Sequence, residues 1–149
     1  MQQHAALTDV FTLRDEAGRT ALHLVSSKSN GEGVSIRQLV SLGADLESRD
    51  AFGRTALCCA CRWGSEENVQ VLVELGADVR VADTDGMTPL HWACARQLER
   101  VKDERLPDEG AREEDVRIVQ LLCAHAADLE ARENSTHGVA LHVACQEQR

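Results

Sequence analysis

Residues 83–93 read DTDGMTPLHWA, and this stretch carries the signals that start a short helix. Thr88 can cap the helix, because its side-chain oxygen can accept a hydrogen bond from one of the first backbone N–H groups. Pro89 then occupies the first helical position, where a missing N–H leaves no intrahelical hydrogen bond unmade. The apolar residues that follow predict a short buried helix.

The same signals recur along the chain. Three further segments align with GMTPLHWA at 86–93: GRTALHLV at 18–25, GRTALCCA at 53–60 and HGVALHVA at 137–144. The segments at 18–25, 53–60 and 86–93 follow one another at intervals of about 33 to 35 residues, a period typical of solenoid proteins. A second set of aligned segments predicts a second helix in each unit: LVSLGADLES at 39–48, LVELGADVRV at 72–81 and LCAHAADLEA at 122–131.

The pattern D-x-x-G-x-T-P-L-H-x-A, followed by V-x-x-L-x-x-G-A-D, resembles the ankyrin repeat over about residues 15–149. The resemblance implies an all-α fold, an ankyrin-repeat solenoid of stacked helix–turn–helix units with projecting β-hairpin turns. Such a unit cannot bury its apolar face alone, so its neighbours bury it. We expect these units: 1–14, a partial N-terminal unit or cap; 15–49, with a two-residue insertion; 50–82; 83–132, with a charged insertion at about 97–113; and 133–149, a partial C-terminal repeat.

The insertion at about 97–113 has two interpretations. Its residues LERVKDERL are good helix formers, so the first helix of the third unit can continue past Cys94. The segment is then either a charged, solvated finger or a dedicated binding element, since loops this long are often functional.

Composition excludes several classes of function. The chain has 149 residues with a net charge of −9, and its 16 basic residues are scattered among 25 acidic ones, so no nucleic-acid partner is expected. No apolar run reaches the roughly 18 residues that a membrane span needs, so membrane insertion is not expected either. The N-terminus lacks the pattern of a signal peptide. With cysteines that look free, this predicts an intracellular protein, with the cytoplasm as the expected compartment and the nucleus as the alternative.

Three cysteines fall within four positions in GRTALCCACRWG at 53–64 and suggest a metal site or a reactive thiol. The repeat favours core packing instead, because Cys61 aligns with Cys94 and Cys145 in a slot for small residues. Helices of neighbouring units lie roughly 8–10 Å apart, too far for such column-mates to share one zinc ion at about 2.3 Å. We therefore expect no metal and no cofactor. A redox sensor centred on Cys58–Cys61 remains the alternative.

Three units have a histidine in the L-H motif, namely His23, His91 and His142, and the second unit has Cys58 in that position. The resemblance implies a structural role for these histidines. They hydrogen-bond the hairpin backbone and tie units together. A phosphate-binding glycine-rich loop, an HExxH motif and a GxSxG motif are all lacking in the sequence. We therefore expect no enzyme. The resemblance implies a non-enzymatic protein–protein interaction module that presents a rigid concave surface. A structural subunit or section of a larger ankyrin array is the other alternative.

By the resemblance, partner contacts come from the hairpin tips and the exposed side of each first helix. Arginine and aromatic residues dominate interface hot spots, and several of them fall at these positions. The candidate partner-binding residues are Arg19, Phe52, Arg54, Arg62, Trp63, Asp85, Met87 and Arg96. Our hypothesis is that a negatively charged or mixed apolar–acidic segment of a protein partner docks there. Alternatively, Trp63 only packs over its own inter-helix turn.

Overall fold

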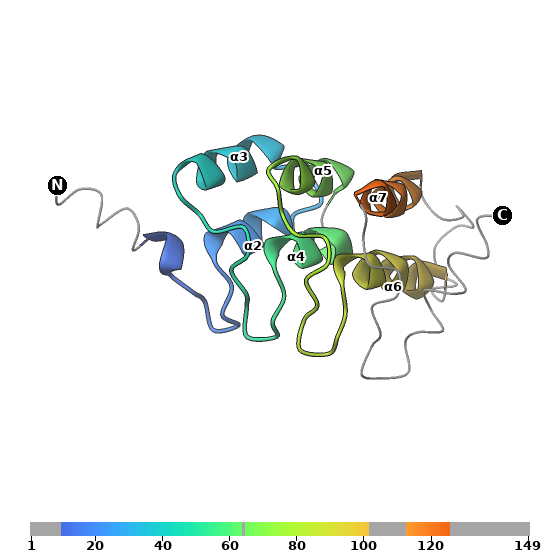
Figure 1. Cartoon of the computed structure of the whole chain (residues 1–149), viewed down its shortest axis with the longest axis horizontal. Coiled ribbons are helices and arrows are strands. Elements are labelled where there is room, and N and C mark those ends of the chain that lie inside the picture. Colours follow the sequence, from blue (N-terminus) through green and yellow to red (C-terminus); the bar gives the residue numbers. More distant parts are fainter. Residues whose placement is uncertain (1–9, 64, 102–112, 126–149) are drawn as a thin grey trace.

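The computed structural model describes residues 10–63, 65–101 and 113–125 of the chain. Its helices form two layers (Figure 1). The first-helix layer contains α2 (Ala21–Ser26), α4 (Ala56–Trp63) and α6 (Pro89–Val101), and the second-helix layer contains α3 (Gly33–Ser41), α5 (Glu66–Glu74) and α7 (Glu113–Ala124). Each helix packs on its partner within the unit and on its counterparts in neighbouring units. The predicted all-α solenoid is confirmed.

The core lies between the two layers and is built from aliphatic side chains, as the shortage of aromatic residues predicts. Each helix contributes at least one side chain that is almost fully buried; the largest are Leu22, Ile36, Leu57, Leu72, Leu90, Ile118 and Leu122. Because these side chains contact residues of the next unit, burial is shared between units. Removing one unit would expose the apolar face of its neighbour.

The turns that project beyond the first-helix layer are tight loops, and the described residues contain no β-strand. In the second turn Asp50 N–H donates to the carbonyl of Arg54 at 3.0 Å, and the third turn repeats this bond between Asp83 and Met87. Backbone bonds also join adjacent turns. Ala51 N–H donates to Ala17 at 3.0 Å, and Thr84 N–H donates to Phe52 at 3.1 Å. The turns are therefore held in register along the stack.

His23 ties the first unit to the second. Its Nδ1 accepts the backbone N–H of Thr20 at 3.1 Å, so in the neutral ring Nε2 carries the hydrogen, which it donates to the carbonyl of Arg54 at 2.8 Å. Burial lowers the pKa of His23 below its usual value, which favours this neutral ring. The predicted structural role is confirmed for His23. In the second unit Cys58 occupies the slot, and its Sγ contacts the hydroxyl of Thr55 at 3.6 Å instead.

The predicted extension of the third unit's first helix is also observed. α6 has 13 residues against 8 in α4, and it continues past Cys94 to Val101. Residues 102–112, which make up most of the predicted insertion, lie outside the described residues, as does the predicted unit at 133–149. The unit boundaries therefore stay predictions. Within the described residues no helix is both long and apolar enough to cross a membrane.

Candidate functional site

Five side chains from the second and third units stack on one another at the surface formed by the turns and the first helices. The guanidinium of Arg54 lies over the ring of Phe52, 4.7 Å from its centroid, and over Trp63 at 5.1 Å. The guanidinium of Arg62 lies over Trp63 at 5.0 Å and over Trp92 at 4.6 Å. We call these residues the arginine–aromatic ladder. The chain has two Phe, two Trp and no Tyr, so the ladder contains three of its four aromatic residues.

The ladder crosses from one unit to the next, because Phe52, Arg54, Arg62 and Trp63 belong to the second unit and Trp92 to the third. Phe52 is 54% exposed and Trp63 is 42% exposed. Trp63 contacts two guanidinium groups, those of Arg54 and Arg62, and packing over its own inter-helix turn stays the alternative interpretation of its position. The ladder therefore presents exposed aromatic area that the fold itself holds in place.

A buried carboxylate anchors the ladder from the second turn. Oδ2 of Asp50 accepts hydrogen bonds from Nε of Arg54 at 2.9 Å and forms an ion pair with its Nη2. Oδ1 of Asp50 accepts the backbone N–H groups of Phe52 and Arg54, each at 2.9 Å. The side chain of Asp50 is fully buried and that of Arg54 is 14% exposed. One aspartate thus fixes both the turn and the direction of the arginine.

The third turn uses the same design with a different donor. Oδ1 of Asp83 accepts the backbone N–H groups of Asp85 and Met87, each at 2.9 Å. Its Oδ2 accepts Nε1–H of Trp92 at 3.0 Å, because Met87 stands where the other turns have arginine. Asp83 therefore orients Trp92 in the third unit in the way that Asp50 orients Arg54 in the second. The repeat alignment offered one signal for Trp92, since it is the large aromatic residue in a column with Leu24 and Cys59. Our list of candidate residues omitted it.

Two of the predicted contact residues are not at the surface, and both corrections have a physical reason. Met87 is 6% exposed. In this turn Trp92 donates the hydrogen bond to Asp83, so the position needs no arginine and an apolar side chain can be buried there. Arg96 is 9% exposed and its Nε lies 3.3 Å from Oδ1 of Asp115, so it links α6 to α7 inside the third unit. Neither residue can serve as an exposed contact of the chain in this conformation.

The remaining two candidates lie at the margins of the ladder. Arg19 is in the first turn, where its Nε donates to Asp15 at 2.8 Å, as Arg54 does to Asp50. Ala17 stands in the slot that Phe52 fills, so the first unit adds no ring to the stack. Asp85 is exposed at the tip of the third turn. The structure thus brings Phe52, Arg54, Arg62 and Trp63 together and leaves Arg19 and Asp85 outside the stack.

The cysteine cluster has the character of core packing. Cys58, Cys59 and Cys61 are each at most 1% exposed. Burial raises the pKa of the Cys58 thiol to about 11 and that of Cys59 to about 12, and it raises the pKa of Cys61 well above its ordinary value. Reactive cysteines need a stabilised thiolate, so these shifts oppose a redox or nucleophilic role. Within the described residues no group of three or more His, Cys, Asp or Glu side chains is placed to hold a metal ion.

We predict that the thiols of Cys58, Cys59 and Cys61 resist alkylation in the native protein. At pH 7 a thiol with a pKa near 11 is only about 10⁻⁴ ionised, and burial slows the reagent further. Iodoacetamide treatment followed by peptide mass spectrometry should label exposed Cys123 first, and the tryptic peptide 55–62 only after urea unfolding. Labelling of that peptide at the rate of Cys123 would instead support a reactive cysteine centre.

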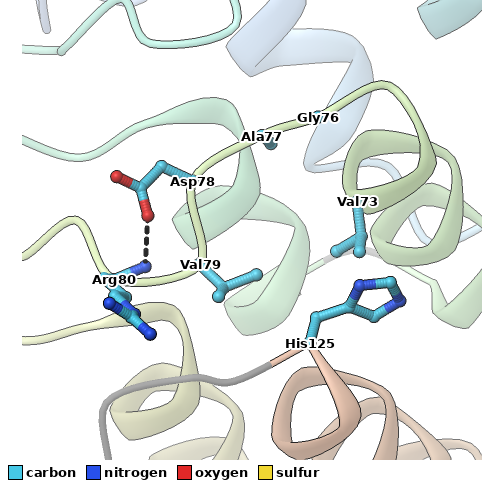
Figure 2. Close-up of a pocket in the computed structure, with 7 residues that line it drawn as sticks. All are labelled: Val73, Gly76, Ala77, Asp78, Val79, Arg80 and His125. Carbon is cyan, nitrogen blue, oxygen red and sulfur yellow. Dashed lines mark hydrogen bonds between the residues drawn. The ribbon is translucent and has the colours of Figure 1, made fainter.

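A pocket lies between the end of α5, the segment that follows it and the end of α7, and no ladder residue lines it. Figure 2 shows this pocket of about 420 Å³, in which Val73 of α5 and His125, directly after α7, face each other. The carboxylate of Asp78 accepts the backbone N–H of Arg80 at 2.9 Å, so it closes its own turn. Among the described residues, no contact in this pocket indicates that it binds a ligand, and we assign the pocket no function.

The helical units agree with a comparison of the sequence with protein families. A family model described as ankyrin repeats (3 copies) matches residues 3–83 and again residues 35–102. Ankyrin repeats are generally protein–protein interaction modules, they bind protein partners, and the family is typically non-enzymatic. The matched region includes all residues of the ladder and of the turns that anchor it. The repeated sequence motif, the two-layered helical stack and this match together show that the chain belongs to the ankyrin-repeat family.

Proposed function

We propose that this chain is a non-enzymatic protein-binding module and that the arginine–aromatic ladder is its main contact surface. The observation that carries the proposal is the concentration of three of the chain's four aromatic residues in one stack with two arginines, in which Phe52 and Trp63 are exposed and Trp92 is partly buried. Trp and Arg are the residue types that most often dominate binding energy at interfaces. A core that needed these rings for stability would have buried Phe52 and Trp63, which are half exposed.

The stack is also prepared for binding before a partner arrives. Association normally costs free energy because flexible side chains must be ordered at the interface. Here Asp50 holds Arg54, and Asp83 holds Trp92. Cation–π contacts, each worth about 0.5–1 kcal/mol at exposed sites, hold the remaining members. A partner that contacts the ladder therefore meets a surface whose ordering cost has mostly been met by folding.

The proposed contact residues are Phe52, Arg54, Arg62, Trp63 and Trp92, with Arg19 and Asp85 at the margin. Met87 and Arg96 are no longer included, because both are buried. The raised thiol pKa values count against the redox-sensor alternative. That the chain is a section of a larger ankyrin array stays a prediction. Free, buried thiols fit a reducing compartment and support the expected cytoplasmic location.

A double variant, Phe52→Ala with Trp63→Ala, tests the proposal on a partner isolated by affinity capture. We expect its dissociation constant to rise about thirtyfold or more, since a hot spot contributes about 2 kcal/mol or more. The matched control is Val34→Ala with Leu42→Ala, because these apolar residues are 71% and 58% exposed on the second-helix layer. Equal affinity of the ladder variant and the control variant, both folded by circular dichroism, would refute the proposal.

A further inference from the structure

The turn between α2 and α3 contains an asparagine followed by a glycine, Asn30 and Gly31. Asn30 is exposed, and Gly31 has a φ of 70°, in the left-handed region that favours glycine. An added Cβ at Gly31 would collide with the carboxylate of Glu67, so the position needs a glycine for space as well as for conformation. Because Gly31 has no side chain, its backbone nitrogen is open to close approach by the side chain of Asn30.

The backbone nitrogen of Gly31 is also not engaged by the protein. None of the hydrogen bonds of the described residues uses its N–H group. The third turn contains a similar pair, Asp85 and Gly86, but there the N–H of Gly86 donates to the carbonyl of Asp83 at 3.0 Å. A bonded nitrogen must give up its hydrogen bond before it can act as a nucleophile, whereas the nitrogen of Gly31 has no such bond to lose.

We propose that Asn30 is a site of spontaneous deamidation and that the product loosens the turn that α5 of the second unit holds. Asparagine is among the thermally labile residues of proteins. The backbone nitrogen of Gly31 loses its proton to solvent and attacks Cγ of Asn30. A bond forms between this nitrogen and Cγ, the bond from Cγ to Nδ2 breaks, and Nδ2 takes a proton from solvent and leaves as ammonia.

Water completes the reaction by opening the cyclic succinimide that results. Addition of water at Cγ gives aspartate, and addition at the backbone carbonyl carbon gives isoaspartate, in which the main chain runs through the former side chain. The net reaction exchanges the amide nitrogen for a water oxygen, so it requires no oxidant, reductant or enzyme. The inference is independent of the proposed function, since no residue of the ladder takes part.

The product forms inside a loop that Asn68 closes. Nδ2 of Asn68 donates to the carbonyl of Lys28 at 2.8 Å, and its Oδ1 accepts the backbone N–H of Glu32 at 2.7 Å. Asn30 lies between these two points of attachment. Isoaspartate lengthens the main chain by a methylene group at this position, so the loop no longer fits both hydrogen bonds of one buried side chain.

The new charge acts in the same direction. Asn30 contacts the side chain of Glu32, and the carboxylate of Glu67 packs against the same turn. A hydrogen bond from Ser35 and the charge of Lys28 lower the pKa of Glu32, so this carboxyl is ionised at neutral pH. Deamidation replaces a neutral amide by a carboxylate among these acidic groups, and like charges at close range repel one another.

Ageing of the native chain at mildly alkaline pH tests the inference, because the attacking nitrogen must be deprotonated. The ageing buffer is made with heavy-oxygen water and the later trypsin digestion with ordinary water, so conversion during digestion stays unlabelled. Mass spectrometry follows peptide 29–37, which contains Asn30. Peptide 63–80 is the internal control, since its Asn68 is buried and is followed by Val69, whose branched side chain shields the backbone nitrogen.

The native turn is expected to leave the reaction free to proceed. Peptide 29–37 should lose ammonia and take up solvent oxygen about as fast in the native chain as in the urea-unfolded chain, while peptide 63–80 stays unchanged in the native chain. Retention of the Asn30 amide in the native chain would overturn the inference, whether or not the unfolded chain reacts. Equal conversion of the two peptides in the native chain would overturn it as well.

The effect on the turn is measured with the variant Asn30→Gln, whose longer side chain disfavours ring closure. Chemical denaturation compares fresh and aged protein. Aged wild type should unfold at a lower urea concentration than fresh wild type, while the midpoint of Asn30→Gln should not change on ageing. A converted wild-type chain with an unchanged midpoint would contradict the loosening of the turn, and so would an equal loss in aged Asn30→Gln.

Discussion

Replacement of Asn68 by alanine is expected to lower the free energy of unfolding by about 3 kcal/mol, one of the two largest losses that we predict. Asn68 lies in α5 with no exposed surface, and it holds the inter-helix turn of the preceding unit. Its Nδ2 donates to the carbonyls of Ser26 at 3.2 Å and Lys28 at 2.8 Å. Its Oδ1 accepts the backbone N–H of Glu32 at 2.7 Å.

The cost arises because alanine leaves three backbone groups of the turn without the side chain that satisfies them. A buried group left unsatisfied costs about 1–3 kcal/mol, and solvent can reach part of this turn, since Lys28 is exposed. Chemical denaturation gives the measurement. The control is Gln70→Ala, two residues along the same helix, where an exposed side chain donates to Glu74 at 3.0 Å. A loss for Asn68→Ala as small as that for Gln70→Ala would show that the turn does not depend on Asn68.

Replacement of Arg96 by methionine should cost about as much, roughly 3 kcal/mol, because it leaves the carboxylate of Asp115 buried without its arginine. The side chain of Asp115 is 2% exposed and that of Arg96 is 10% exposed. Together they join α6 to α7, the two helices on either side of residues 102–112. Thermal or chemical unfolding of the variant measures the loss.

A double variant separates the pair from its burial. Arg96→Met with Asp115→Leu removes both charges, and apolar replacement of a buried ion pair is often close to neutral, so much of the lost stability should return. Arg117→Met is the exposed comparison, since its ion pairs with Glu66 and Glu113 are at the surface and should contribute less than about 1 kcal/mol. Additive losses in the double variant would contradict a coupled buried pair.

The sequence was sufficient for the repeat and its helices, since each unit carries its own start and stop signals. It also placed the cysteines correctly, because alignment put Cys61 and Cys94 in one buried column. The same alignment gave a wrong prediction for Met87 and Arg96. We expected both to be exposed, because they align with positions at the turn tips and on the exposed side of the first helices. Their burial depends on what their neighbours do: Trp92 replaces arginine as the donor to Asp83, and Asp115 of another helix draws Arg96 inward.

The ladder itself could be predicted only in part for a similar reason. Phe52, Arg54, Arg62 and Trp63 were chosen one at a time as residue types common in interfaces. That these four residues stack depends on side-chain directions within the second unit, which a residue-type pattern does not contain. That Trp92 completes the stack depends on its contact with Arg62, which joins the second unit to the third. The period identifies which helices are neighbours, but the rotamers that join side chains across units come from packing.

Site-specific photo-crosslinking tests most directly the central claim that the ladder is the contact surface. The photoreactive amino acid p-benzoylphenylalanine is placed at Phe52 in one protein and at Val34 in another. Both positions are more than half exposed, and they lie on the turns and on the second-helix layer respectively. The account predicts that a captured partner is cross-linked from position 52 and not from position 34. Cross-links from position 34 alone would contradict it.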